Sequence, residues 1–388
     1  MGFYTHYALF LILSLHVLVS SLIILSVNSY SKAEYFIMVN TKYYVTTASG
    51  LEDVTWAEIS TKLKNVTLDE KKPERLLFNY SGDHKNLLKI RSAENIYIHI
   101  GTIKGLTRSR NSLGDIFRAV SSFDFDNALL IHKELHGGKG KKRLTFRIYS
   151  SMDSRHNFRR VDAQNSAVSA LEKKHDWKLD LETPILEFQM DLENDSALFG
   201  LKITDERLHR WGYKNSHVPA SLKPSIAHCL VLLSNPIPSD IFIDPMCGAG
   251  TISIERAFAY PYQQIIAGDI SGESISSARE NIRSSHKSID LMFWNVSAIP
   301  IKDRSIDKLV SNLPFGRQTG SHSENQYLYA IFFKEMKRIM KPNGKAVLLT
   351  TERALMKNII ARYRDIKIDK QIYIEISGLR ACIYVLNF

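Results

Sequence analysis

Cysteine is scarce in this sequence: Cys229, Cys247 and Cys382 are the three present among 388 residues. Their wide spacing and odd number fit neither a disulfide framework nor a zinc cluster. We therefore expect a protein of a reducing compartment, the cytoplasm, that holds no metal. None of the three has the position of a thiolate nucleophile for attack on cytosine C5, and Cys247 is interpreted as a small packing residue.

Charged residues are missing from one early segment. Tyr7 to Val27 is apolar and contains no Asp, Glu, Lys or Arg, and it is long enough to span a bilayer. No Lys or Arg precedes it and no small-x-small cleavage site follows it, so export through a signal peptide is disfavoured. A membrane anchor with the basic chain on the cytoplasmic side is one alternative. We favour a second, in which residues 1–37 extend the chain from an upstream start codon and the protein begins at Met38.

An apolar strand, a glycine-bearing turn and a helix follow one another in IFIDPMCGAGTISIE, from Ile241 to Glu255. Gly248, Ala249 and Gly250 form a turn whose backbone can approach a ligand where a side chain would collide. Asp269 closes the next strand, at the separation from Gly250 at which a Rossmann-like crossover brings a carboxylate to ribose hydroxyls. Alone, this pattern also fits a structural turn or a dinucleotide-binding enzyme.

A second motif follows the strand-like segment DKLVS and consists of Asn312, Leu313, Pro314 and Phe315. It therefore lies at the carboxyl end of the fourth strand, where open α/β sheets bind their ligands. The exocyclic amine of a nucleobase is weakly nucleophilic, so a transferase must hold acceptors at its N–H groups and aim its lone pair. The Asn312 oxygen and a nearby backbone carbonyl can accept these bonds, and Phe315 can stack on the base. A strand-end turn with a core phenylalanine is the alternative.

Together the motifs resemble the class I S-adenosylmethionine-dependent methyltransferases that carry an (Asp/Asn/Ser)-(Pro/Leu)-Pro-(Phe/Tyr) motif. DPMCGAGTISIE, GDIS, NLPFGRQTGS, RLHRWGY and LKP are similar to the branch with an N-terminal THUMP domain, the TrmN-like tRNA guanine-N2-methyltransferases. The resemblance covers residues 39–388, and its opening strand and helix favour Met38 as the start.

The resemblance implies S-adenosyl-L-methionine as cofactor. Asp244, Gly248 and Gly250 would line its methionine end, Asp269 would bind its ribose, and residues 312–315 would hold the guanine as the catalytic set. The cofactor-binding set is Asp244, Met246, Cys247, Gly248, Ala249, Gly250, Thr251, Asp269, Ile270, Asn295, Val296 and Asn312. Asn295 stands where the family usually has an Asp for the adenine amine, and an amide oxygen accepts that bond with less charge assistance.

Net charge favours a polyanionic partner, since 51 Lys and Arg outnumber 40 Asp and Glu. Between Gly137 and Arg160 there is one acid, Asp153, among the cations Lys139, Lys141, Lys142, Arg143, Arg147, Arg155, Arg159 and Arg160. We interpret this segment as an RNA-contacting surface, the alternative being a solvated face. Lys223 and Arg317 are further candidate RNA contacts.

The chain is long enough for several cores, and we expect an α/β catalytic domain after an α+β region. The predicted parts are residues 1–37 (extension), 38–100 (ferredoxin-like), 101–203 (THUMP), 204–224 (linker) and 225–388 (Rossmann-like methyltransferase). The catalytic sheet should be seven-stranded and mostly parallel, with strands near Ile241, Ile265, Leu291, Lys308 and Ala346 and a C-terminal antiparallel hairpin.

The leading functional hypothesis is methylation of the guanosine N2 amine in tRNA, at position 6 of the acceptor stem, by in-line displacement without a covalent intermediate. Three alternatives stay open. They are the same chemistry at tRNA position 10 or on ribosomal RNA, methylation of adenine N6, and a non-catalytic RNA-binding role.

Overall fold

The structure is a computed structural model, and it describes residues 40–137, 143–153, 155–205, 212–216, 221–316, 322–376 and 378–388. The predicted extension, residues 1–37, lies outside these ranges. Within them, no helix combines the length and apolar character needed to cross a membrane.

The N-terminal region, residues 40–205, is an α+β unit built on one sheet. Its elements are β1 (Thr41–Thr46), α3 (Glu52–Lys62), β2 (Val66–Lys72), β3 (Arg75–Tyr80), the 3-10 helix η1 (His84–Lys89), β4 (Asn95–Lys104), α4 (Ser112–Ser122), α5 (Asp126–His136), β5 (Thr145–Met152), α6 (Arg160–His175), β6 (Lys178–Leu179), β7 (Leu186–Glu193) and β8 (Ser196–Lys202). Alternation of apolar and polar residues, clearest in β7 (LEFQMDLE), directs one face of the sheet into the core.

Eight strands form this sheet in the order β2-β3-β1-β4-β8-β7-β5-β6. Antiparallel pairing of β4 with β8 joins the strands of residues 40–104 to those of residues 145–202. The boundary predicted between residues 100 and 101 falls inside β4, so the two predicted N-terminal parts share one sheet and one apolar core.

The C-terminal region alternates helices and strands as predicted. Its elements are α8 (Pro224–Leu233), β9 (Ile241–Asp244), α9 (Thr251–Ala259), β10 (Gln264–Asp269), α10 (Gly272–Ser285), β11 (Asp290–Phe293), β12 (Ile306–Asn312), α11 (His322–Ile339), β13 (Met340–Thr350), α12 (Arg353–Ile360), β14 (Lys367–Ile376) and β15 (Leu379–Asn387).

Seven strands form the second sheet in the order β11-β10-β9-β12-β13-β15-β14. The pairs among β9 to β13 are parallel, and β15 runs antiparallel to both β13 and β14. The predicted mostly parallel sheet and its C-terminal hairpin are therefore confirmed. Apolar clusters on both faces of the sheet explain why its central strands are apolar almost throughout.

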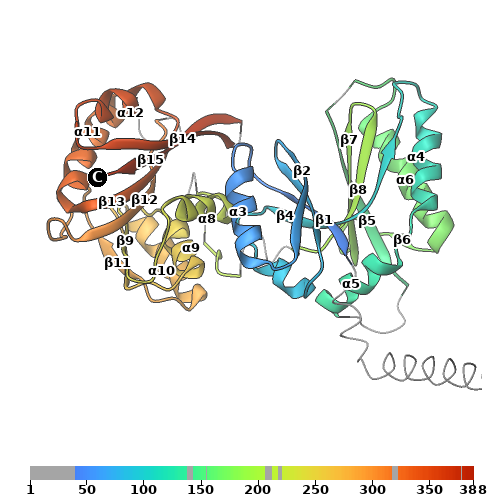
Figure 1. Cartoon of the computed structure of the whole chain (residues 1–388), viewed down its shortest axis with the longest axis horizontal. Helices are drawn as coiled ribbons and strands as arrows, with labels where there is room; N and C mark the ends of the chain where they lie inside the picture. The colour runs from blue at the N-terminus through green and yellow to red at the C-terminus, as the bar shows by residue number, and fades with distance from the viewer. Residues whose placement is uncertain are drawn as a thin grey trace, which may run out of the picture.

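Figure 1 shows the two sheets side by side along the long axis of the molecule, with α3 and α8 between them. The strand β14 reaches toward the turn before α3. A side chain at Gly50 in that turn would lie 2.2 Å from the Tyr373 carbonyl oxygen, so glycine permits this close approach, and its φ of +88° is also one that glycine tolerates.

Candidate active site

A cavity of about 460 Å³ lies at the carboxyl ends of β9, β10 and β12. This is where an open parallel sheet with reversed strand order leaves a crevice for a ligand, and the volume suits a small molecule. Of the predicted site residues, the lining contains Met246, Cys247, Gly248, Ala249, Thr251, Asp269, Ile270, Asn295, Val296, Asn312, Leu313, Pro314 and Phe315. The fold thus brings together at one cavity two motifs that are far apart in the sequence.

The turn at Gly248–Gly250 is defined by left-handed glycine conformations and by hydrogen bonds to its backbone. Gly248 and Gly250 have φ of +51° and +79°, in the left-handed region that favours glycine. The Gly248 N–H donates to Asp269 Oδ2 at 2.8 Å, and the Ser271 N–H donates to Asp269 Oδ1 at 2.9 Å. Asp269 therefore fixes the turn and borders the cavity, and Asn281 supports the turn from α10 by donating to the Ala249 carbonyl.

Two predicted cofactor-binding residues, Asp244 and Gly250, are not part of the cavity lining. Asp244 ends β9 directly before Pro245 and Met246, which line the cavity, and it is fully buried. Its Oδ1 accepts a hydrogen bond from the Ser311 hydroxyl at 3.2 Å, while its Oδ2 has no hydrogen-bond partner among the described residues. Burial, together with the nearby charge of Asp269, raises the pKa of Asp244 to about 8. A buried carboxyl with one unused oxygen is suited to receive a cationic group of a ligand.

The Asn312 turn is anchored from two neighbouring elements. The Leu313 N–H donates to the Leu349 carbonyl of β13 at 2.9 Å. The Pro314 carbonyl accepts from Tyr329 Oη at 2.7 Å and from Asn325 Nδ2 at 3.1 Å, both on α11. The two lone pairs of that carbonyl are thereby occupied, so it is not the acceptor for a substrate amine.

Asn312 itself keeps an unused acceptor. Its Oδ1 is buried and has no hydrogen-bond partner within the described part of the chain, although its residue lines the cavity. An unsatisfied buried carbonyl costs free energy unless a ligand supplies the donor. The half-buried Phe315 lines the same cavity, so an acceptor and an aromatic ring lie in one lining.

Several lining residues were not predicted, among them Ser221, Leu222, Trp294 and Leu328. Trp294 Nε1 donates to the Pro245 carbonyl at 3.0 Å, and its ring packs on Gly268, where an added Cβ would lie 2.1 Å from the indole. Trp294 directly precedes Asn295, a predicted cofactor-binding residue, and this position could have indicated that it lines the cavity. The Asn295 Oδ1 accepts the Ser297 N–H at 2.9 Å and so also shapes its own turn.

The three cysteines are buried and free. Burial raises the pKa of each thiol, so none is activated as a nucleophile. This agrees with the interpretation of Cys247 as a packing residue in the cofactor turn.

The predicted RNA-contacting residues are less uniform. Lys139, Lys141, Lys142 and Arg317 lie outside the described residues. Arg143 pairs with Asp176, and Arg159 pairs with Asp162 at the start of α6. Arg160 donates to Ser150 and Gln164, Arg155 is exposed, and Lys223 pairs with Glu94 at 2.9 Å. Arg143, Arg159 and Lys223 remain more than half exposed in spite of these pairs.

The C-terminal region has the class I methyltransferase fold, as predicted. Residues 211–381 match the family model of the RMKL-like methyltransferase domain.

The chain is similar to the tRNA (guanine(6)-N(2))-methyltransferase THUMP3 of Homo sapiens, with 31% identity over 248 residues that cover 60% of this chain and 48% of that protein. It spans about half the length of that relative. It is 25% identical to a tRNA (guanine(6)-N2)-methyltransferase of Methanocaldococcus jannaschii, over 89% of this chain and 99% of that protein. The solved structure of TrmN from Thermus thermophilus aligns with a TM-score of 0.74 at 23% identity, over 89% of this chain and 99% of that one.

Proposed function

We propose that this chain is an S-adenosylmethionine-dependent methyltransferase that modifies the N2 amine of guanosine in tRNA, at position 6 of the acceptor stem. One observation carries the proposal. Two buried oxygens without partners among the described residues, Asp244 Oδ2 and Asn312 Oδ1, stand at the carboxyl ends of the neighbouring strands β9 and β12. Asn312 lines the cavity, and Asp244 directly precedes Pro245 and Met246, which line it.

The residues present fit the cofactor. Asp244 supplies a carboxyl oxygen for the cationic amino group, the turn at Gly248 and Gly250 admits close backbone approach, and Asp269 borders the cavity where ribose hydroxyls would bind. Ile270 and Val296 offer apolar contacts to the adenine, beside Asn295. When bound, S-adenosylmethionine supplies a methyl group activated on a sulfonium.

Asn312 has the decisive role toward the base. Its Oδ1 accepts one N–H of the exocyclic amine, which turns the nitrogen lone pair toward the methyl donor. Charge that grows on the amine nitrogen is stabilised by the same acceptor. Phe315 stacks on the guanine, and the rigid anchoring of Pro314 by Tyr329 and Asn325 keeps the acceptor in place without reorganisation.

tRNA as substrate is supported by the names of the relatives and by the excess of cations. A guanine in the acceptor stem must leave its duplex to reach the cavity, at a cost of a few kcal/mol that phosphate contacts of the N-terminal region offset. We place this activity in the cytoplasm, where RNA and methyl donor coexist.

The test uses purified protein, radiolabelled methyl donor and tRNA from cells that lack this modification, followed by nucleoside mass spectrometry and mapping of the labelled position. N2-methylguanosine at position 6 is the expected product, and Asn312→Ala is the matched variant that should bind donor without transferring methyl. Label at position 10 or in ribosomal RNA would correct the substrate, and label in N6-methyladenosine would overturn the base assignment. Donor binding without transfer to any RNA would contradict the proposal as a whole.

A further inference from the structure

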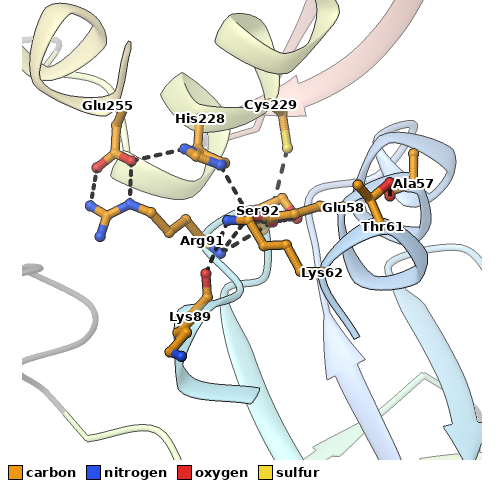
Figure 2. Close-up of polar contacts among 10 residues, drawn as sticks. All are labelled: Ala57, Glu58, Thr61, Lys62, Lys89, Arg91, Ser92, His228, Cys229 and Glu255. Atoms are coloured by element: carbon orange, nitrogen blue, oxygen red, sulfur yellow. Dashed lines mark hydrogen bonds and ion pairs between the residues drawn. The ribbon is translucent and has the colours of Figure 1, made fainter. Parts of the chain in front are cut away.

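A cluster of charged side chains lies outside the cavity, where the N-terminal region meets the methyltransferase domain (Figure 2). Glu58 and Lys62 come from α3 and Arg91 from the segment before β4. On the other side, His228 comes from α8 and Glu255 from α9. The side chains of Glu58, His228 and Glu255 are at most 1% exposed.

His228 is placed between two carboxylates that belong to different regions of the chain. Its Nδ1 lies 3.1 Å from Glu255 Oε2, and its Nε2 lies 3.1 Å from Glu58 Oε1. A neutral imidazole carries one N–H, so its other nitrogen would face a carboxylate oxygen lone pair to lone pair. An imidazolium, with an N–H on each nitrogen, donates to both carboxylates.

Both carboxylates are held in the ionised state by donors on every side. Glu255 accepts from Arg91 Nε and Nη2 at 2.8 and 2.7 Å and from Tyr213 Oη at 2.7 Å. Glu58 accepts from Lys62 Nζ and from the backbone N–H groups of Arg91 and Ser92. Each ring nitrogen of His228 lies 3.1 Å from an oxygen of one of these ionised carboxylates, a contact that is favourable when the nitrogen carries a hydrogen.

The pKa values of these groups move in the same sense. Burial lowers the pKa of His228, but the two carboxylates outweigh burial and the net shift is upward. Burial raises the pKa of Glu58 and of Glu255, and the surrounding cations reverse this and hold both below their usual range. Tyr213, Lys214 and Cys229, which also adjoin the cluster, have pKa values shifted toward their neutral forms.

The helices that carry the cluster also border the cavity. Ser221 and Leu222, which directly precede α8, and Thr251 and Ile252, which open α9, line the cavity. Arg91 thus reaches from the N-terminal region to the helix that begins at the cofactor turn.

We propose that His228 is a positioning residue: as an imidazolium it fastens the N-terminal region to α8 and α9, and so fixes the RNA-contacting region relative to the cavity. The part that concerns RNA rests on the proposed function, whereas the charged bridge does not. Because the bridge needs a protonated ring and two carboxylates, it is fully formed between the ordinary carboxyl and imidazole pKa values. It weakens in acid as Glu58 and Glu255 gain protons, and it weakens in alkali as His228 loses one.

The state of the ring is tested on the full chain labelled with 15N-histidine, with His228→Gln to assign the signal. We expect both ring nitrogens of His228 to be protonated at pH 7, which is above the ordinary imidazole pKa of about 6.5. An unprotonated ring nitrogen at pH 7 would overturn the proposal. Glu58→Gln, which keeps a hydrogen-bonding oxygen and removes one charge, should shift the titration of His228 to lower pH.

The positioning role is tested by kinetics of methyl transfer. In His228→Gln we expect KM for tRNA to rise about tenfold, a loss of about 1.4 kcal/mol, while kcat and the Kd for S-adenosylmethionine change less than twofold. The matched control is His286→Asn, at the exposed C-cap of α10 with φ of +53°, which should change none of the three. An unchanged KM, or a loss confined to kcat, would contradict the role.

If His228→Gln does not fold, Glu58→Gln carries the same kinetic test, with its rise in KM appearing at lower pH than in the wild type. If the wild type methylates no RNA, the proposed function fails. The labelled-histidine experiment, with small-angle scattering of both variants for separation of the two regions, then decides the bridge alone.

Discussion

The substitution Asp244→Asn should stabilise the free protein and weaken its binding of the cofactor. The Asp244 carboxyl is fully buried, and burial raises its pKa from 3.8 to about 8. A carboxyl with a raised pKa destabilises the folded state as pH rises from its ordinary value to its folded value. At pH 7 this costs on the order of 4 kcal/mol, at 1.36 kcal/mol for each pH unit above 3.8.

The amide of the variant does not ionise, so this cost disappears. Its Nδ2 group, buried without an acceptor, would take back about 1–3 kcal/mol. We therefore expect free Asp244→Asn to be more stable than the wild type by about 1–3 kcal/mol at pH 7, with an advantage that grows by about 1.4 kcal/mol from pH 6 to 7. Cofactor affinity should fall by about ten- to a hundredfold, because a charge-assisted bond to the amino group is lost.

Urea unfolding of the free protein at pH 6, 7 and 8 gives the first quantity, and titration calorimetry with S-adenosylmethionine gives the second. Asp240→Asn is the control. Asp240 is also buried and directly precedes β9, but its carboxylate pairs with Arg256 and accepts the Ile237 N–H at 2.7 Å. That variant should be destabilised by about 3–5 kcal/mol, as when a buried pair is broken. The reasoning is refuted if both variants shift stability in the same direction, or if Asp244→Asn keeps the pH slope of the wild type.

Two further predictions concern the cavity. Asn312→Ala should lower kcat by about a hundred- to a thousandfold with cofactor Kd unchanged, whereas Asp269→Ala should weaken cofactor binding first; calorimetry and single-turnover assays separate these, and equal loss of cofactor binding in both would contradict the roles. Gly268→Ala should cost about 1–3 kcal/mol in unfolding free energy because its Cβ would lie 2.1 Å from the Trp294 ring. Gly272→Ala is the control: its added Cβ would have no neighbour within 4 Å at the start of α10, so the change should be neutral or stabilising. Equal stability of the two variants would contradict the prediction, because it would mean that the Trp294 ring moves away at no cost.

The catalytic fold and the lining of the cavity could be predicted because their signals are local. Each motif follows its own strand, and parallel strands deliver their carboxyl ends to one edge of the sheet. Asp269 and Asn312 end two of these parallel strands, and both therefore line the same cavity. The support of the Asn312 turn was not visible in the sequence, because Tyr329 and Asn325, which donate to the Pro314 carbonyl, lie on α11.

A count of charges within one segment of sequence does not predict which cations are paired, because acidic partners can lie outside that segment. The basic segment has one internal acid, yet Arg143 pairs with Asp176 beyond the end of α6, and Arg159 pairs with Asp162 three residues along the chain. The same holds for His228, a residue in an apolar helix whose two carboxylate partners lie far away in the sequence. Long-range pairing also places β4 across the expected domain boundary, because strand partners are chosen by register and burial and not by proximity in the chain.

The pairing of β4 with β8 has a consequence for synthesis on the ribosome. Strands β2, β3, β1 and β4 can assemble once residue 104 has emerged, but β4 then presents an open edge until β8 arrives at residue 196. At about 5–20 residues per second this edge stays unpaired for on the order of 5–20 s. An unpaired strand edge is a site for wrong association, so the nascent chain should need chaperone protection during this interval. For the same reason, a fragment that ends near residue 104 should aggregate, whereas one that continues through β8 should remain in solution.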